Sequence, residues 1–85
     1  MPYFLYILKS EKDECYYVGT TRDVDERINR HNQGRSKYTK NKRPWHLVYV
    51  EEHPDRSSAM KRESAIKRRK SKEYISKLIE GHSYV

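Results

Sequence analysis

The sequence is poor in cysteine and lacks long apolar segments. Cys15 is the single cysteine among 85 residues, so the chain can form no internal disulfide and no metal site built from several cysteines. A lone thiol fits a reducing compartment, and we expect a cytoplasmic protein. No apolar run approaches the roughly 20 residues of a membrane-spanning helix. No basic segment followed by an apolar one opens the chain, so we expect neither a membrane anchor nor a secretory leader.

Apolar residues of every kind are few, at 34% of the chain against 36% charged residues. That balance approaches the composition of disordered chains. Eight tyrosines, one tryptophan and one phenylalanine nevertheless supply bulky side chains for a core. We therefore expect a single folded domain over 1–85, with its core over about 2–79 and a short C-terminal tail that contains His82.

The net charge of +7 favours polyanionic partners. The basic residues fall into two clusters. The first contains no acid and is interleaved with aromatic residues: Arg30, Arg35, Lys37, Lys40, Lys42 and Arg43, with Tyr38 and Trp45. The second is interrupted only by Glu63: Lys61, Arg62, Lys67, Arg68, Arg69, Lys70 and Lys72. Both clusters can contact phosphates. A solvated helix face remains the alternative for the second, and a plain surface connection remains the alternative for the loop over 34–44.

Alternation of side chains predicts three strands. The segment 2–9 is apolar or aromatic on both faces, which places it at the centre of a sheet. A short polar connection leads to a return strand over 14–19. A third strand is expected over 45–50, with Trp45, Leu47 and Tyr49 on one face.

Capping residues and helical spacing predict three helices. The first begins after Asp23, has Glu26 in the position of a capping box, and stops before Gly34. The second is expected from Ser57 or Ser58 to residue 70, after a turn over 51–56. The third follows Ser71 and ends at Gly81. The expected fold class is α+β, a three-stranded, mostly antiparallel sheet flanked by helices in the order β-β-α-β-α-α.

The first helix places two polar side chains on its inward face. Val24 and Ile28 are its only apolar residues, and at 100° per residue His31 shares their stripe while Arg27 lies at its edge. A guanidinium and an imidazole that face the protein are costly unless something there needs them. This is the first indication of a site.

A carboxylate lies on the apolar stripe of the second helix. Ala59, Met60 and Ile66 form this stripe, and Glu63 lies in its middle. Glu63 is either half of a salt bridge to an interior cation such as Arg27 or a ligand of a divalent metal. The spacing alone favours the salt bridge, although magnesium commonly takes only one or two carboxylates. His46 and His53 are expected at the surface.

Two tyrosines complete the set of candidates. Tyr6 and Tyr17 lie on strands that are expected to pair, so their hydroxyls can flank one spot near the start of the first helix. The motifs Leu5-Tyr6-Ile7 and Tyr17-Val18-Gly19, followed by Arg27, His31 and Glu63, together resemble the GIY-YIG nuclease domain. The likeness covers about 2–79 and is closest to small standalone members. Phe4-Leu5-Tyr6 stands in place of Gly-Ile-Tyr, and no asparagine follows Asn41, where some members use one.

The resemblance implies a metal-dependent DNA endonuclease. Glu63 would hold one divalent metal, Mg²⁺ or Mn²⁺, against the scissile phosphate. Arg27 would donate to the negative charge of the transition state. Tyr17 would lie beside the attacking water, with Tyr6 helping to position it. Either Tyr17 or His31 would accept the proton, and the sequence leaves both open.

The resemblance also implies a nucleic-acid partner, and Gly19 would allow a close turn from strand to helix. The expected nucleic-acid contacts are Arg30, Arg35, Lys37, Tyr38, Lys40, Lys42, Arg43 and Lys67. Without a separate recognition domain, cutting would be selective for DNA structure, as in DNA repair, or directed by a protein partner. The alternatives are a binding module of the same fold with little or no cleavage, and an accessory subunit of a repair or RNA assembly. The complete set of five candidate residues favours the nuclease. The sequence predicts no oligomeric state.

Overall fold

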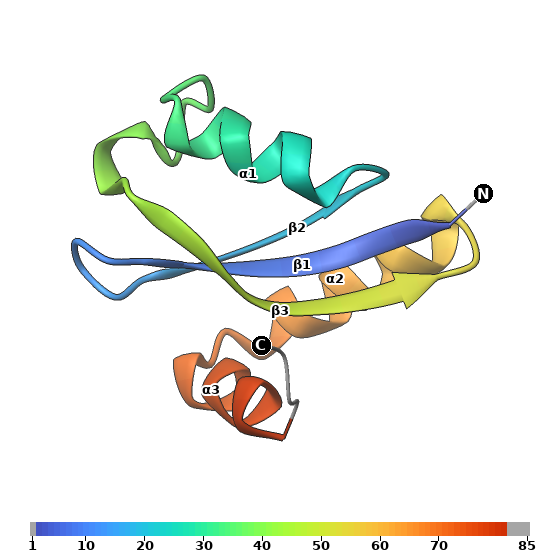
Figure 1. The fold of residues 1–85 in the computed structure, drawn as a ribbon. Helices are drawn as coiled ribbons and strands as arrows, with labels where there is room; N and C mark the ends of the chain where they lie inside the picture. The colour runs from blue at the N-terminus through green and yellow to red at the C-terminus, as the bar shows by residue number, and fades with distance from the viewer. Residues whose placement is uncertain (1, 82–85) are drawn as a thin grey trace.

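The computed structural model describes residues 2–81, and the expected tail with His82 lies outside them. The element order β-β-α-β-α-α is confirmed, with one short 3₁₀ helix in the loop before the third strand (Figure 1). The elements are β1 (Tyr3–Ser10), β2 (Tyr16–Thr21), α1 (Val24–Asn32), η1 (Lys40–Lys42), β3 (Trp45–His53), α2 (Arg56–Arg69) and α3 (Lys72–Glu80).

The three strands form one antiparallel sheet in the order β2-β1-β3. β1 is the central strand, as its two apolar faces predicted, and its residues 5–8 have no exposed surface. β2 starts two residues later than expected because Glu14 adopts a left-handed backbone with φ 60°. β2 also continues past Gly19 to Thr21, and β3 continues through residues 51–53, where a turn was expected.

A β-bulge in β3 changes the face on which Tyr49 lies. Ile7 pairs with Tyr49 and Leu8 pairs with Leu47, so Val48 is an extra residue in β3. One extra residue reverses the alternation. Tyr49 therefore lies on the opposite face from Trp45 and Leu47, and the expected common face was wrong.

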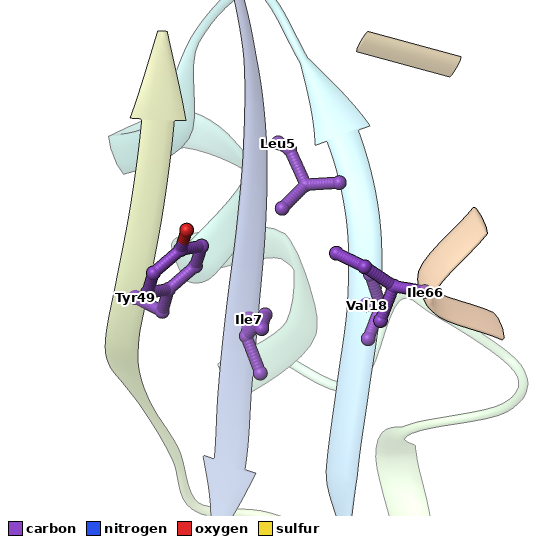
Figure 2. Packing of buried hydrophobic residues seen from close by; sticks show 5 residues of the cluster. All are labelled: Leu5, Ile7, Val18, Tyr49 and Ile66. Carbon is purple, nitrogen blue, oxygen red and sulfur yellow. The ribbon is translucent and has the colours of Figure 1, made fainter. Parts of the chain in front are cut away.

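The sheet separates two apolar clusters, with α1 on one side and α2 and α3 on the other (Figure 1). On the side of α2, the buried cluster comprises Leu5, Ile7, Val18, Tyr49 and Ile66 (Figure 2). The apolar residues of α3 pack against this cluster, namely Tyr74, Ile75, Leu78 and Ile79. On the side of α1, the cluster comprises Tyr6, Leu8 and Trp45, with Tyr17, Ile28 and Leu47 around it. The site described below lies on the side of α1.

The caps of α1 and α3 form largely as expected. The Asp23 side chain accepts from the Glu26 backbone N–H at 3.0 Å, and Gly34 ends the α1 segment with φ 78°. Glu26 does not reach back to Asp23 as a capping box would. Its carboxylate pairs instead with Arg30 at 2.9 Å, one helical turn on. Ser71 caps α3 by accepting from the backbone N–H of Tyr74.

α2 begins and ends earlier than predicted. Its N-cap is Asp55, whose side chain accepts from the Ser58 backbone N–H at 2.8 Å, so neither Ser57 nor Ser58 is the cap. The helix stops at Arg69 because Lys70 adopts a left-handed backbone with φ 47°. Met60, expected on the apolar stripe, is 44% exposed.

Ion pairs fasten α2 to β3. Arg62 donates to Glu51 at 3.1 Å, and His53 contacts the same carboxylate at 2.9 Å. His53 is thus half-buried and bonded, contrary to the expected surface position, whereas His46 is exposed as expected. The hydrogen bonds from Tyr49 and Arg62 outweigh burial, and they hold the pKa of Glu51 below its ordinary value.

Candidate active site

A buried hydrogen-bonded chain joins β1, α1 and the loop before β3. The Tyr6 hydroxyl lies 3.1 Å from Nε2 of His31, and Nδ1 of His31 lies 2.7 Å from the Thr39 hydroxyl. Tyr6, His31 and Thr39 are each at most 2% exposed. Tyr6 therefore meets the last turn of α1, and not its start as expected. In a neutral imidazole one nitrogen donates and the other accepts, so the chain has one consistent proton order at a time.

The electrostatics of this chain favour neutral groups. Burial, together with the charges of Arg27 and Arg30, lowers the pKa of His31. Burial also raises the pKa of Tyr6, and the neighbouring phenol of Tyr17 raises it further, while Arg27 opposes both effects. Tyr6 therefore keeps its proton and His31 lacks a charge at neutral pH.

Tyr17 is the aromatic member of the site that reaches the surface. Its ring centroid lies 4.7 Å from that of His31 and 6.2 Å from that of Tyr6. The ring centroid of Trp45 lies 6.3 Å from that of Tyr17, in an edge-on arrangement. Since Tyr17 is half-buried whereas Tyr6 and His31 are buried, Tyr17 is the ring that a molecule from outside can touch.

Gly19 makes room for the Tyr6 hydroxyl. The two residues are cross-strand partners. A Cβ on Gly19 would lie 2.6 Å from the Tyr6 hydroxyl oxygen and 3.1 Å from Cε2 of Tyr17. Because β2 continues to Thr21, the expected role of Gly19 in a strand-to-helix turn is replaced by this close approach.

Arg27 carries a buried donor that lacks an acceptor. Its Nε is buried and has no hydrogen-bond partner among the described residues, the nearest carboxylate oxygen being that of Glu26 at 3.9 Å. The charge of Arg27 acts on both Tyr6 and His31. The side chain as a whole is 32% exposed, so the outer part of this guanidinium, beside a cluster of neutral groups, is suited to an anionic oxygen supplied from outside.

Glu63 approaches the site from α2. Its carboxylate is 21% exposed, and Oε2 lies 2.6 Å from Nζ of Lys67, one helical turn on. Glu63 thus forms a salt bridge, but its partner is the exposed Lys67 and not an interior cation such as Arg27. The charge of Glu63 raises the pKa of Tyr6, so carboxylate and phenol act on one another although α2 and α1 cover opposite faces.

Comparisons with known proteins identify the family of this chain. The family model described as the GIY-YIG catalytic domain matches residues 2–77. The chain belongs to the GIY-YIG family. A UPF0213 protein of Staphylococcus aureus strain Mu3 is 47% identical over 66 residues, which cover 76% of this chain and 79% of the relative. The solution structure of UPF0213 protein BH0048 from Bacillus halodurans has a TM-score of 0.59 and 34% identity, and covers 94% of this chain and 84% of that one.

Because the chain belongs to the GIY-YIG family, it is a member of a nuclease family, as the motifs predicted. It also agrees with the expected likeness to small members, since the matched relatives are covered over most of their length. Among residues 2–81, no helix has the length and apolar character needed to span a membrane.

The donor set of this GIY-YIG domain fits a metal that needs few protein ligands. Residues 2–81 hold no group of three or more His, Cys, Asp or Glu side chains that could surround an ion. Oε1 of Glu63 has no hydrogen-bond partner among the described residues, because Lys67 occupies Oε2 alone. One available carboxylate fits Mg²⁺, which completes its coordination with water and phosphate oxygens.

Hydrogen bonds connect the basic loop before β3 of this GIY-YIG domain to the site. Nε1 of Trp45 donates to the Thr39 carbonyl at 2.9 Å, and the Asn32 side chain bonds both the N–H and the carbonyl of Trp45. Thr39 and Asn32 were not among the expected site residues. Nothing local marks them, because their partners in the site lie 8 and 13 residues away.

The first basic cluster separates into engaged and available cations. Arg30 pairs with Glu26, Lys42 pairs with Asp13, and Arg43 donates to backbone carbonyls. Within residues 2–81, no acidic partner is found for Arg35, Lys37 and Lys40. Tyr38 lies between the last two and is 87% exposed.

Proposed function

We propose that this protein is a metal-dependent endonuclease that hydrolyses phosphodiester bonds in DNA. The observation that carries the proposal is the convergence of groups from three elements, α1, β2 and α2, on the Tyr6 hydroxyl of β1. His31 bonds the Tyr6 hydroxyl, Tyr17 lies beside both rings, and the charges of Arg27 and Glu63 act on the same oxygen. Simple binding of nucleic acid would not need these groups at one place.

Arg27 and Glu63 bind the phosphate from two sides. Arg27, whose side chain is 32% exposed, donates from its guanidinium group to a non-bridging oxygen, where negative charge increases in the transition state. Glu63 is the ligand for Mg²⁺ or Mn²⁺. When bound, the metal supplies a positive charge for the phosphate and the leaving oxygen. Lys67, which holds the other carboxylate oxygen, would add positive charge beside a neighbouring phosphate.

Tyr17 is the catalytic tyrosine because it is the exposed one. It contacts the attacking water and accepts its proton as the general base. Tyr6 and His31 are positioning residues, since both are buried and both ring nitrogens of His31 are bonded within the protein. His31 remains the alternative proton acceptor.

The substrate is bound beside the loop that holds Thr39. Lys40 and Tyr38 flank Thr39 in the sequence, so phosphate and base or sugar contacts fall next to the buried chain. The positions of Arg35 and Lys37 extend this surface. Specificity comes from DNA structure or from a protein partner.

The test is cleavage of branched, nicked and linear DNA by purified protein with Mg²⁺, with Mn²⁺ and with EDTA. We expect cutting that requires metal and prefers one DNA structure. Tyr17→Phe should lower the rate by about 10²–10⁴-fold, as loss of a general base does. Tyr16→Phe is the matched control, because Tyr16 packs on the opposite face of the sheet. DNA binding without cleavage under all conditions would favour the binding module instead.

A further inference from the structure

The second basic cluster does not form one uniform surface. Arg62 is held by Glu51, and the guanidinium of Arg69 lies 4.2 Å from the ring centroid of Tyr74. Lys67 is paired with Glu63. These three cations belong to the packing of α2 or to the candidate active site, so the whole cluster cannot be a solvated helix face.

The remaining cations of α2 line a groove along its outer side. Arg56, Lys61 and Arg68 have no ion-pair or hydrogen-bond partner among residues 2–81. They border an open groove of about 1190 Å³, whose lining includes Met60 and Ser64 and contains no acidic residue. The groove therefore combines unpaired positive charge with a hydroxyl and an exposed apolar side chain.

Lys67 connects this groove to the candidate active site. At 100° per residue, Lys67 lies between Glu63 and the stripe formed by Met60 and Ser64. Lys67 lines the groove and also bonds Glu63 at 2.6 Å. The groove consequently lies one residue away from the candidate metal ligand, with Lys67 between them, and extends along α2.

We propose that this groove on α2 binds the sugar-phosphate backbone of the nucleic acid on the side of Glu63 away from the loop over 35–43. The chemistry suits a backbone, because cations contact phosphates while Met60 packs on the apolar sugar between them. An acidic peptide or an anionic membrane would use the charge but would not need an opening that leads to Glu63. The inference rests on the proposed function for its place in catalysis, but it is tested by binding alone.

The binding test uses a short fluorescein-labelled DNA duplex, EDTA in place of metal, and a series of salt concentrations. The groove variant is Lys61→Gln with Arg68→Gln. The matched control is Lys72→Gln with Lys77→Gln, which removes the same charge from exposed positions of α3. Each lost phosphate contact reduces the slope of log K against log salt by about 0.9, so the groove variant should lose about 1.8 in slope. The control should bind like the parent.

Met60 supplies a local readout. The chain has two methionines, so ¹³C-methyl labelling gives two signals, and a Met60→Leu variant identifies the one from the groove. We expect the Met60 signal to shift with the same dependence on duplex concentration as the fluorescence anisotropy. Circular dichroism establishes that both double variants are folded.

Three results would overturn the inference. The first is equal affinity and salt slope for the groove variant and the parent, and the second is a Met60 signal that stays in place while duplex binds. The third is groove-dependent binding of vesicles made from equal parts of phosphatidylcholine and phosphatidylserine, without such binding of DNA. If the groove variant loses DNA binding but the parent never cuts DNA, the groove stands and the nuclease proposal fails. If the parent cuts DNA and the groove variant cuts and binds equally well, the groove inference alone fails.

Discussion

Replacing Gly19 with alanine tests the link between β2 and the buried chain of the site. The added Cβ would lie 2.6 Å from the Tyr6 hydroxyl oxygen and 2.8 Å from its Cζ. Tyr6 has no exposed surface, so it can move only by disturbing its neighbours. We expect Tyr6 to shift and to lose its hydrogen bond to His31.

The cost follows from either response. Overpacking a full core costs about 1–3 kcal/mol, and leaving the His31 nitrogen buried without a partner costs about 1–3 kcal/mol. Alanine recovers roughly 0.5–1 kcal/mol because glycine is the worse strand residue. A net loss of about 2 kcal/mol should lower Tm by roughly 8–16 °C in a domain of this size.

The assay is urea unfolding of a double-mutant cycle with Tyr6→Phe. Removing the hydroxyl removes the closest clash, so Gly19→Ala should cost less in the Tyr6→Phe background, with a coupling of about 1 kcal/mol. Gly81→Ala is the matched control, because its Cβ would meet no atom nearer than 3.6 Å. Its effect should stay within about 0.5 kcal/mol. A Gly19→Ala protein as stable as Gly81→Ala, or strictly additive effects of the two changes, would refute the reasoning.

Three further predictions concern the metal ligand, the pH dependence of stability and base stacking. Glu63→Gln should abolish metal-dependent cleavage while DNA binding survives. Because the ion pair to Lys67 is partly exposed, urea unfolding should show a loss of stability of no more than about 0.5 kcal/mol. Full cleavage by the variant would exclude Glu63 as the metal ligand. The pKa of His31 is lowered by burial and by Arg27 and Arg30, so the unfolded chain binds the proton at higher pH than the folded chain. The contribution of His31 to the free energy of unfolding should be complete above about pH 6.5 and fall below it. His31→Gln should flatten the dependence of the unfolding free energy on pH, measured from pH 7 to pH 5. Tyr38→Ala should weaken binding of single-stranded DNA by about 1–3 kcal/mol through loss of stacking without changing Tm, and unchanged affinity in a fluorescence titration would remove Tyr38 from the interface.

The sequence predicted the elements where one local rule decides the structure. The two apolar faces of β1 predicted its central position, and the caps Asp23 and Ser71 form as expected. The bulge at Val48 was missed because alternation is counted without gaps, and nothing in the sequence marks an extra residue. The cap of α2 was misassigned because Asp55 and two serines are all good N-cap residues, and spacing does not distinguish them.

Helical and strand spacing could predict on which face several candidate residues lie, but not how they pair. Helical spacing placed His31 inward, and the structure buries it to 2% exposure. The partner of Glu63 was misjudged because helical spacing gives the face on which a side chain starts, and not the position of its charged end. Lys67 lies four residues after Glu63, so the two side chains are neighbours on the helix surface, and the ammonium group of Lys67 contacts the Glu63 carboxylate. Thr39 was missed because its contacts depend on the path of a loop.

The position of the site explains why its residues come from both layers of the molecule. β2 is an edge strand and α2 packs against it. Gly19 has no side chain on this strand, so the Tyr6 hydroxyl lies directly over β2, and the charge of Glu63 on α2 acts on it. Any side chain at position 19 would stand between the phenol and this edge. Gly19 therefore allows the phenol of the central strand to lie over the same edge strand that α2 covers from the other face.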